Sequence, residues 1–178
     1  MAVLREAGVN QSSRGVESLE TGAWRRLGRA HAAGQAIAEL ESERASCSRL
    51  AFGRIYARPG QTEASWRAEL RTALALAAEH LSLYQLTIEP GTAFEAQHRR
   101  GDIVLPEDDD AARLYEATAE EAANFGLLPY EIPNYAKPGA VSRHNLAYWR
   151  YADSAGVGTG AHGAGTVGND LVHDSPTP

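Results

Sequence analysis

Hydrophobic and polar positions along this chain form short apolar runs separated by stretches with a helical pattern. Apolar runs within 9–18, 50–56 and 80–88 predict three strands, and the last of these has the strongest strand pattern. Two intervening segments predict helices: 21–43 is rich in alanine, leucine, arginine and glutamate, and 63–79 has apolar positions at helical spacing. Strands that alternate with helices of this length indicate βαβ units and a parallel sheet.

The second half of the chain continues this alternation with less regular segments. Residues 94–101 and 108–124 predict two more helices, and three acids open the second one, where the helix dipole favours negative charge. Residues 130–135 predict a short strand that Pro133 interrupts. Residues 166–178 are expected to form a disordered tail. The visible strands are too few to close an eight-stranded barrel, so the pattern indicates part of an α/β sheet followed by an irregular region.

Composition adds that large apolar side chains are scarce. Hydrophobic residues make up 43% of the 178, but alanine supplies 32 of them and Leu, Ile, Val and Phe together supply 33. Alanine buries little area, so the few large side chains must form any core. The net charge of −6 argues against a general nucleic-acid binder, because no basic surplus is present to meet phosphates.

The single cysteine, Cys47, also limits the chemistry that this chain performs by itself. One thiol forms no internal disulfide and does not hold an iron–sulfur cluster or a thiolate zinc site. No apolar run approaches the length of a membrane span, and the first residues show no secretory pattern. These features lead us to expect a cytoplasmic protein with no membrane span.

Several short motifs have both a functional and a structural interpretation. Arg58 follows a predicted strand and either meets an anionic ligand or belongs to a turn before the next helix, for which Thr62 is a candidate N-cap. Glu89 ends the strongest strand, and an ordinary Glu-Pro-Gly turn is favoured over a catalytic carboxylate. His144 lies among polar residues before Tyr148, where a structural hydrogen-bonding cluster is favoured over a polar pocket.

The glycine-rich segment 158–163 matches the pattern G-x-G-x-x-G. This pattern binds dinucleotides only between a strand and a helix N-terminus, and the residues around it predict neither. A mobile loop is the favoured interpretation. The alternative is that the glycines let the backbone approach a ligand closely.

A series of longer motifs occurs in a fixed order along the chain. They are AGVN at 7–10, LGRAH at 27–31, IY at 55–56 with RPGQT at 58–62, HLSLYQLTIEPGTAF at 80–94, YEIPNYA at 130–136, SRHNL at 142–146 with YW at 148–149, and GVGTGAHG at 156–163. Together they resemble the HemW family over about residues 5–165. These are radical S-adenosylmethionine proteins related to oxygen-independent coproporphyrinogen III oxidase and described as heme chaperones.

The resemblance implies a fold, cofactors and partners. The implied fold is a partial (β/α) TIM-type barrel with parallel strands and flanking helices, and residues 1–165 would be its C-terminal part with the region that follows. The implied cofactors are S-adenosylmethionine, a 4Fe–4S cluster held by an N-terminal CxxxCxxC motif, and heme. The implied partners are heme or a porphyrin, and a protein that receives heme.

The resemblance also assigns site residues, and several depart from the family. The cofactor positions are Glu17 where the family has Gln, Arg29, which is kept, and Gly53 where the family has Asp. The exchange at Glu17 adds a charge and removes an amide donor, while the exchange at Gly53 removes a carboxylate. Ala57 stands where the family has a loop glycine. The candidates for binding heme or substrate are His144, Tyr148 and His162.

We therefore expect a fragment, or a degraded relative, of a HemW-like protein that is inactive in radical chemistry by itself. The family role would be heme chaperoning or coproporphyrinogen oxidation. Two alternatives remain open. One is a non-enzymatic module that binds heme or a partner, and the other is a truncated reading frame without function.

Overall fold

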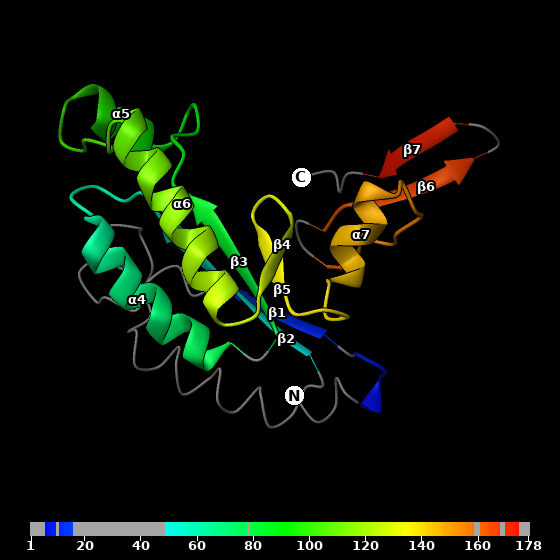
Figure 1. The fold of residues 1–178 in the computed structure, drawn as a ribbon. Helices are drawn as coiled ribbons and strands as arrows, with labels where there is room; N and C mark the ends of the chain where they lie inside the picture. Colours follow the sequence, from blue (N-terminus) through cyan, green and yellow to red (C-terminus); the bar gives the residue numbers. More distant parts are fainter. Residues whose placement is uncertain are drawn as a thin grey trace. The chain divides into compact units, whose positions relative to one another are not determined.

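The computed structural model describes residues 6–9, 11–15, 49–77, 79–158, 161–167 and 170–174. These residues fall into two compact units, 1–140 and 141–178. The first unit contains a five-stranded sheet with the strand order β1-β2-β3-β5-β4, and the second contains a separate two-stranded sheet. Figure 1 shows both sheets and their helices. The helix predicted over 21–43 and the residue Cys47 lie outside the described residues.

The three strands predicted in the first half of the chain are confirmed. They are β1 (Gln11–Gly15), β2 (Arg49–Tyr56) and β3 (His80–Gln85). β2 lies between the other two and pairs with both in parallel, as the sequence predicts. The first unit is therefore a mixed α/β fold with a parallel core.

The end of the sheet differs from the prediction. One strand interrupted by proline was expected over 130–135, but the structure forms a hairpin of β4 (Leu128–Glu131) and β5 (Asn134–Ala136). β5 pairs antiparallel with β3, so the all-parallel sheet that the sequence predicts is wrong at this edge. The reason is local, because Ile132 and Pro133 form the turn and a proline has no amide hydrogen for a ladder. The Pro133 carbonyl accepts a 2.9 Å hydrogen bond from the Leu83 amide.

Two long helices, α4 (Glu63–Leu76) and α6 (Asp108–Asn124), lie side by side and cover one face of the sheet (Figure 1). Thr62 caps α4 as predicted, and its hydroxyl accepts a 3.2 Å hydrogen bond from the Ser65 amide. A short helix, α5 (Ala93–Arg99), precedes α6.

The core lies between this sheet face and the two helices. Its large side chains include Phe52, Tyr56, Leu81, Leu83 and Tyr135 from the sheet, Trp66, Leu70 and Leu74 from α4, and Leu114 from α6. The alanine-rich composition has a use here, because Ala73 on α4 and Ala122 on α6 are fully buried. Small side chains let two helices approach closely, so few large residues suffice to fill the layer.

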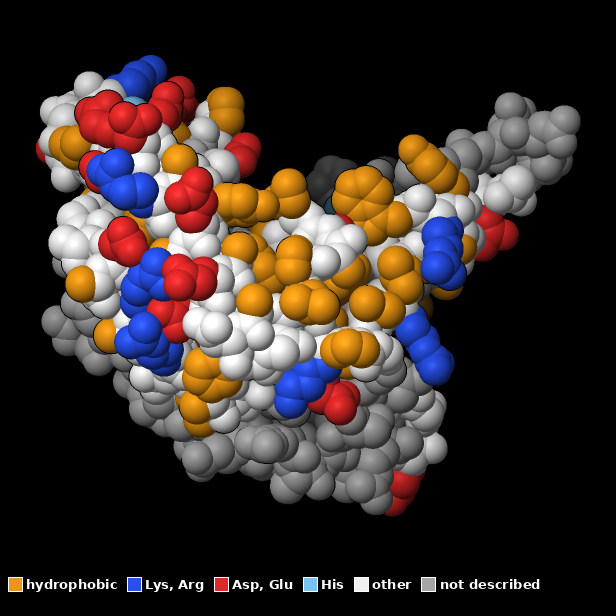
Figure 2. All heavy atoms as spheres, in the orientation of Figure 1, with side chains coloured by type: hydrophobic (Ala, Val, Ile, Leu, Met, Phe, Trp, Pro, Cys, Tyr) orange, Lys and Arg blue, Asp and Glu red, His pale blue; other side chains and the backbone are white. Residues whose placement is uncertain are grey.

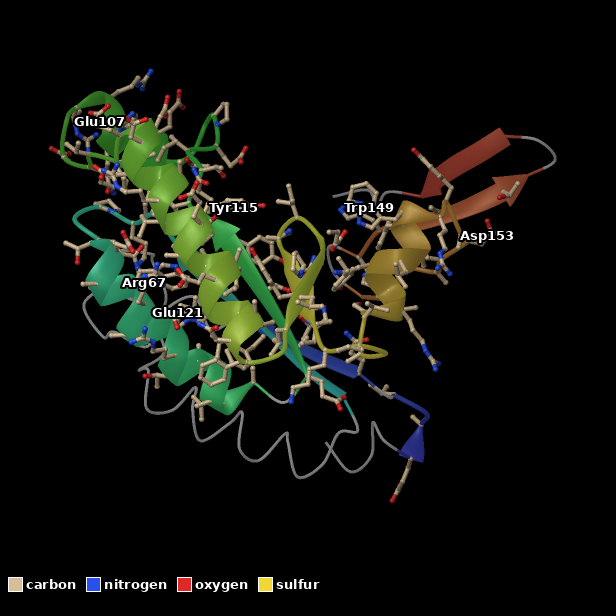
Figure 3. The ribbon with its side chains drawn as sticks, viewed as in Figure 1. Arg67, Glu107, Tyr115, Glu121, Trp149 and Asp153 are labelled. Atoms are coloured by element: carbon tan, nitrogen blue, oxygen red, sulfur yellow. The ribbon has the colours of Figure 1, made fainter. Side chains whose placement is uncertain are left out.

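A network of ion pairs joins α4 and α6 at the surface, where Figure 2 shows charged side chains gathered over both helices. Arg67 on α4 contacts Glu63, Glu120 and Glu121, and Figure 3 shows Arg67 and Glu121 pointing toward one another. Arg71 also donates two hydrogen bonds to Glu121, at 2.9 and 2.7 Å. Glu121 is nearly buried, so the two arginines compensate a carboxylate that has lost most of its water.

The second unit contains α7 (Arg143–Trp149) and a hairpin of β6 (Gly163–Val167) and β7 (Asp170–Asp174). Ser142 caps α7 and accepts a 3.3 Å hydrogen bond from the Asn145 amide. The hairpin occupies residues for which the sequence predicts a disordered tail from 166. The two strands pair with one another through backbone hydrogen bonds, and the glycine-rich, polar composition of these residues does not predict that pairing.

Candidate functional site

The sheet face opposite α4 and α6 carries a row of small and polar residues. The strand register pairs Gly15 with Gly53, Gly53 with Ser82, and Ser82 with Asn134. Paired residues of neighbouring strands project to the same face, and successive residues of a strand project to opposite faces. Because Phe52 packs in the core beneath the helices, this row faces away from them. We call these four residues the Gly53 row.

Hydrogen bonds hold the polar end of the Gly53 row in place. The Ser82 hydroxyl donates to the Asn134 side-chain oxygen at 2.5 Å, and the Asn134 amide nitrogen donates to the Glu131 carboxylate. Ser82 and Asn134 are both buried, so their orientations are fixed by these partners. The two glycines at the other end have no side chains and leave backbone at the surface of the face.

His80 lies on the same face, two residues before Ser82. Its side chain is buried, and its Nε2 lies 2.7 Å from the Tyr130 hydroxyl. His80 on β3 therefore contacts β4 through Tyr130, on the same sheet face as the Gly53 row.

The structure describes only one of the three positions that the resemblance assigns to the cofactor. Gly53 lies at the centre of the Gly53 row, between Gly15 and Ser82. Glu17 and Arg29 lie outside the described residues. The resemblance alone singled out Gly53, and its neighbours Ser82 and Asn134 had no signal apart from their places in the HLSLYQ and YEIPNYA motifs.

The candidates for heme or substrate contact lie in the second unit. His144 and Tyr148 are one turn apart on α7, and their rings meet edge to face with centroids 4.8 Å apart. Both are exposed, and within the described part of the chain the His144 imidazole makes no hydrogen bond. His162 is exposed just before β6, and no contact joins it to that pair among the described residues.

Arg58 lies in the turn before α4, which is one of the two interpretations of the sequence, and its carbonyl accepts a 3.0 Å hydrogen bond from the Gln61 amide. It is only 7% exposed, and its guanidinium forms an ion pair with Glu69 on α4. Arg54 on β2 pairs with the same carboxylate and is fully buried. Arg54 was the sequence signal for this buried ion pair, because an arginine on the core side of a strand requires a carboxylate nearby.

The glycine-rich loop of the second unit approaches its own backbone rather than a phosphate. A Cβ at Gly156 would lie 2.7 Å from the carbonyl carbon of His162, and one at Gly163 would lie 3.0 Å from the carbonyl oxygen of Ser154. Ser154 and Ala164 form an antiparallel bridge at this point. A strand, β6, follows the loop in place of the helix that dinucleotide binding requires.

The described residues contain no group of three or more His, Cys, Asp or Glu side chains that could hold a metal ion. The acids at 108–110 open α6, as the sequence predicts. Within the same residues, no helix is long and apolar enough to cross a membrane.

Known proteins resemble this chain over most of its length, although no protein-family model matches it. The zebrafish protein named radical S-adenosyl methionine domain-containing protein 1, mitochondrial, is 39% identical over 158 residues, which are 88% of this chain and 36% of that protein. The heme chaperone HemW of Bacillus subtilis is 36% identical over 164 residues, 92% of this chain and 43% of the relative. HemW of Escherichia coli is 39% identical over 161 residues, 89% of this chain and 41% of the relative.

Over this length, the chain is a HemW-family sequence. It spans between 36% and 43% of the length of the relatives named above. The HemW resemblance seen in the motifs is thereby confirmed by identity that extends across both units.

Two solved structures have a fold similar to that of this chain. The coproporphyrinogen III oxidase of Escherichia coli, described as a radical SAM enzyme, superposes with a TM-score of 0.69 over 90% of this chain and 40% of that chain. Its sequence identity of 21% shows similarity of fold alone. The Elp3 protein of Methanocaldococcus infernus superposes with a TM-score of 0.54 over 64% of this chain, at 13% identity.

Proposed function

We propose that the Gly53 row forms part of an S-adenosylmethionine site in a HemW-type protein of heme or porphyrin metabolism. The observation that carries this proposal is the position of Gly53, which the resemblance assigns to the cofactor, between Gly15 and Ser82 on the face away from the helices. On this proposal, β1 to β3 are consecutive strands of a partial barrel, and the Gly53 row faces its interior. The superposition on the coproporphyrinogen oxidase supports that assignment.

The residues of the row suit a cofactor with flat and polar parts. Gly15 and Gly53 leave space where the backbone and a ligand can approach closely. Ser82 and Asn134 supply a hydroxyl and an amide that are already oriented. S-adenosylmethionine supplies radical chemistry in this family when an electron source is present, and here the row would bind and orient it. The missing carboxylate at Gly53 removes an acceptor for ribose hydroxyls and a partner for the positive charge of the cofactor.

The chain does not fit the other cofactor of the family. A 4Fe–4S cluster is held by several cysteine thiolates, and Cys47 is the only cysteine of this sequence. We derive no electron-transfer step from these residues, and we propose that this chain by itself is inactive in radical chemistry. Anaerobic incubation with iron, sulfide, dithionite and S-adenosylmethionine should give no deoxyadenosine above a protein-free control. Deoxyadenosine formation that depends on the chain would contradict this part of the proposal.

Binding of S-adenosylmethionine tests the site directly. Equilibrium dialysis with labelled cofactor should show weak binding to the wild-type chain and at least about tenfold tighter binding to Gly53→Asp, which restores the family carboxylate. Gly53→Asn is the matched control, because it has a similar shape without the charge. If Gly53→Asp and Gly53→Asn bind equally, or if neither binds, the assignment of Gly53 to the cofactor site is wrong.

Heme binding at α7 is the second candidate function, and one observation favours it. His144 is exposed and makes no hydrogen bond within the described residues, so its imidazole is available as an axial ligand. The exposed rings of Tyr148 and Trp149 lie on the same helix and offer area for a flat macrocycle. Hemin titration should shift the Soret band, and the shift should be lost in His144→Ala or His162→Ala. The same shift in both variants rejects this site.

The wider expectations from the resemblance remain part of the proposal. The partners would be heme or a porphyrin and a protein that receives heme, as expected for a relative of heme chaperones. A cytoplasmic location stays a prediction, because the zebrafish relative is named as mitochondrial. The alternative of a truncated reading frame without function predicts a chain that does not fold. A cooperative unfolding transition, followed by circular dichroism, would count against that alternative.

A further inference from the structure

A cavity of about 650 Å³ lies in the first unit, away from the Gly53 row. One wall is a stripe of α6 that contains Ala111, Ala112 and Tyr115, and the β4–β5 hairpin forms the opposite wall. Its floor includes Tyr56 and Leu83, which project from the sheet on the same side as the core. Figure 2 shows hydrophobic side chains gathered beside α6 on this face. The floor of the cavity therefore lies on the other face of the sheet from the Gly53 row, and Glu131, which accepts a hydrogen bond from Asn134, lines the cavity at the edge of the sheet.

Two buried tyrosines line the cavity with hydroxyls that have no partner. Tyr56 and Tyr135 are each 3% exposed. Within the described part of the chain, neither hydroxyl makes a hydrogen bond, and Tyr56 only stacks its ring on Trp66. Buried hydroxyls are normally paired, so a ligand in this cavity could form hydrogen bonds with both. Neither oxygen is among the fully enclosed unpaired atoms, so each keeps accessible surface.

These hydroxyls are donors at neutral pH. Burial raises the pKa of Tyr135 to about 12, and burial with the nearby Tyr135 and Tyr115 raises the pKa of Tyr56 further. A protonated hydroxyl donates one hydrogen bond and can also accept one, so acceptor atoms such as a carbonyl oxygen or a ring nitrogen would use both donors. Gln85 also lines the cavity, with an amide that donates and accepts.

The charged groups of the cavity restrict the ligand further. Asp108 and Glu131 line it, and no Lys, Arg or His is among the described residues of the lining. An anion placed there would meet two carboxylates and no compensating charge. The walls of alanine, proline, leucine and tyrosine suit a flat apolar body, and the volume is typical of sites for small organic molecules.

We propose that this cavity binds an uncharged, planar aromatic molecule with a carbonyl or ring-nitrogen acceptor that meets the Tyr56 and Tyr135 hydroxyls. The proposal does not depend on the cofactor site, which lies on the other face of the sheet. It also separates this cavity from heme binding, since porphyrin carboxylates would be repelled by Asp108 and Glu131.

A pair of probes of equal shape and different charge tests the proposal on the full chain. 2-Naphthamide is neutral, whereas 2-naphthoate is an anion at pH 7. A titration followed by saturation-transfer NMR should show naphthamide binding at least about tenfold tighter than naphthoate. Tyr135→Phe and Tyr56→Phe should each weaken naphthamide binding about fivefold, the effect of one lost hydrogen bond. Both variants should stay folded, because they remove only unpartnered hydroxyls, and circular dichroism checks this.

Tyr84→Phe is the matched control, because Tyr84 is 47% exposed and lies outside the cavity lining. It should bind naphthamide as the wild type does. Equal binding of the two probes, no binding of naphthamide, or unchanged binding in both the Tyr56 and Tyr135 variants would overturn the proposal.

Discussion

The indole nitrogen of Trp66 donates a 2.7 Å hydrogen bond to the hydroxyl of Thr118, and both side chains are fully buried. Trp66 lies on α4 and Thr118 on α6, so the bond joins the two helices inside the core. The Thr118 hydroxyl in turn donates to the Leu114 carbonyl at 2.6 Å. Every polar group of this contact is therefore satisfied without water.

Thr118→Val should lower the free energy of unfolding by about 1–3 kcal/mol, because it preserves the shape but leaves the buried indole N–H without an acceptor. Urea denaturation followed by circular dichroism measures this. Thr72→Val is the control, since Thr72 is exposed on α4 and its hydroxyl only meets the Ala68 carbonyl. Equal losses in the two variants would show that the buried bond has no special weight.

Ala57→Gly should stabilise the protein. Ala57 has a φ of 56°, a left-handed conformation that costs a residue with a Cβ roughly 1–2 kcal/mol. After the entropy of glycine in the unfolded chain is subtracted, we expect a gain of about 0.5–1 kcal/mol in unfolding free energy. Ala51→Gly on β2 is the control, because Ala51 is equally buried but lies within the ladder, and its loss of stability should be about 0.5–1 kcal/mol. A value for Ala57→Gly at or below that of Ala51→Gly would contradict this account.

Gly156→Ala should open the glycine-rich loop of the second unit. The new Cβ would lie 2.7 Å from backbone at His162, which cannot move away as a flexible side-chain end does. The Ala164 amide donates to Ser154 across this contact at 2.9 Å, so its protection from hydrogen exchange should fall about tenfold or more. Gly165→Ala is the control, because a Cβ there meets nothing within 4 Å. Unchanged protection of Ala164 in Gly156→Ala would show that the close approach is unimportant.

Glu121 should make stability depend on acid pH. Hydrogen bonds from Arg71, and then from Arg67, hold the pKa of Glu121 below its ordinary value of 4.5. A carboxyl whose folded pKa is lowered stabilises the protein above its unfolded pKa, and this contribution is lost as pH falls from about 4.5 through the folded pKa. Unfolding free energies measured between pH 7 and pH 3 should therefore fall less steeply in Glu121→Gln than in the wild type. Glu120→Gln, at an exposed position, should keep the wild-type slope.

The sequence predicts the elements of this fold better than their long-range pairing. Residues 108–124 form a helix with the predicted bounds, because acids mark its start and Gly126, with a φ of 76°, lies just beyond its end. The β4–β5 hairpin was missed because its turn at Ile132 and Pro133 is too short to separate from a single strand. Such local signals act within a few residues.

The candidate site was predictable only through resemblance. Ser82 and Asn134 are 52 residues apart, and only the register of β3 with β5 brings them together. Arg54 and Arg58 share Glu69 for the same reason, since the contact depends on how α4 packs on β2. Residue patterns identify which side chains are buried on a strand, but not which side chain on another element faces them.

The most direct test of the proposed function is to map S-adenosylmethionine on the protein by NMR. With the ¹⁵N-labelled chain and its Gly53→Asp variant, added cofactor should shift the amides of Gly15, Gly53, Ser82 and Asn134, with larger shifts in the variant. Amides on the outer faces of α4 and α6 should not move. Shifts confined to α7 or to the outer helices, or none at the Gly53 row in either protein, would contradict the assignment of this sheet face to the cofactor.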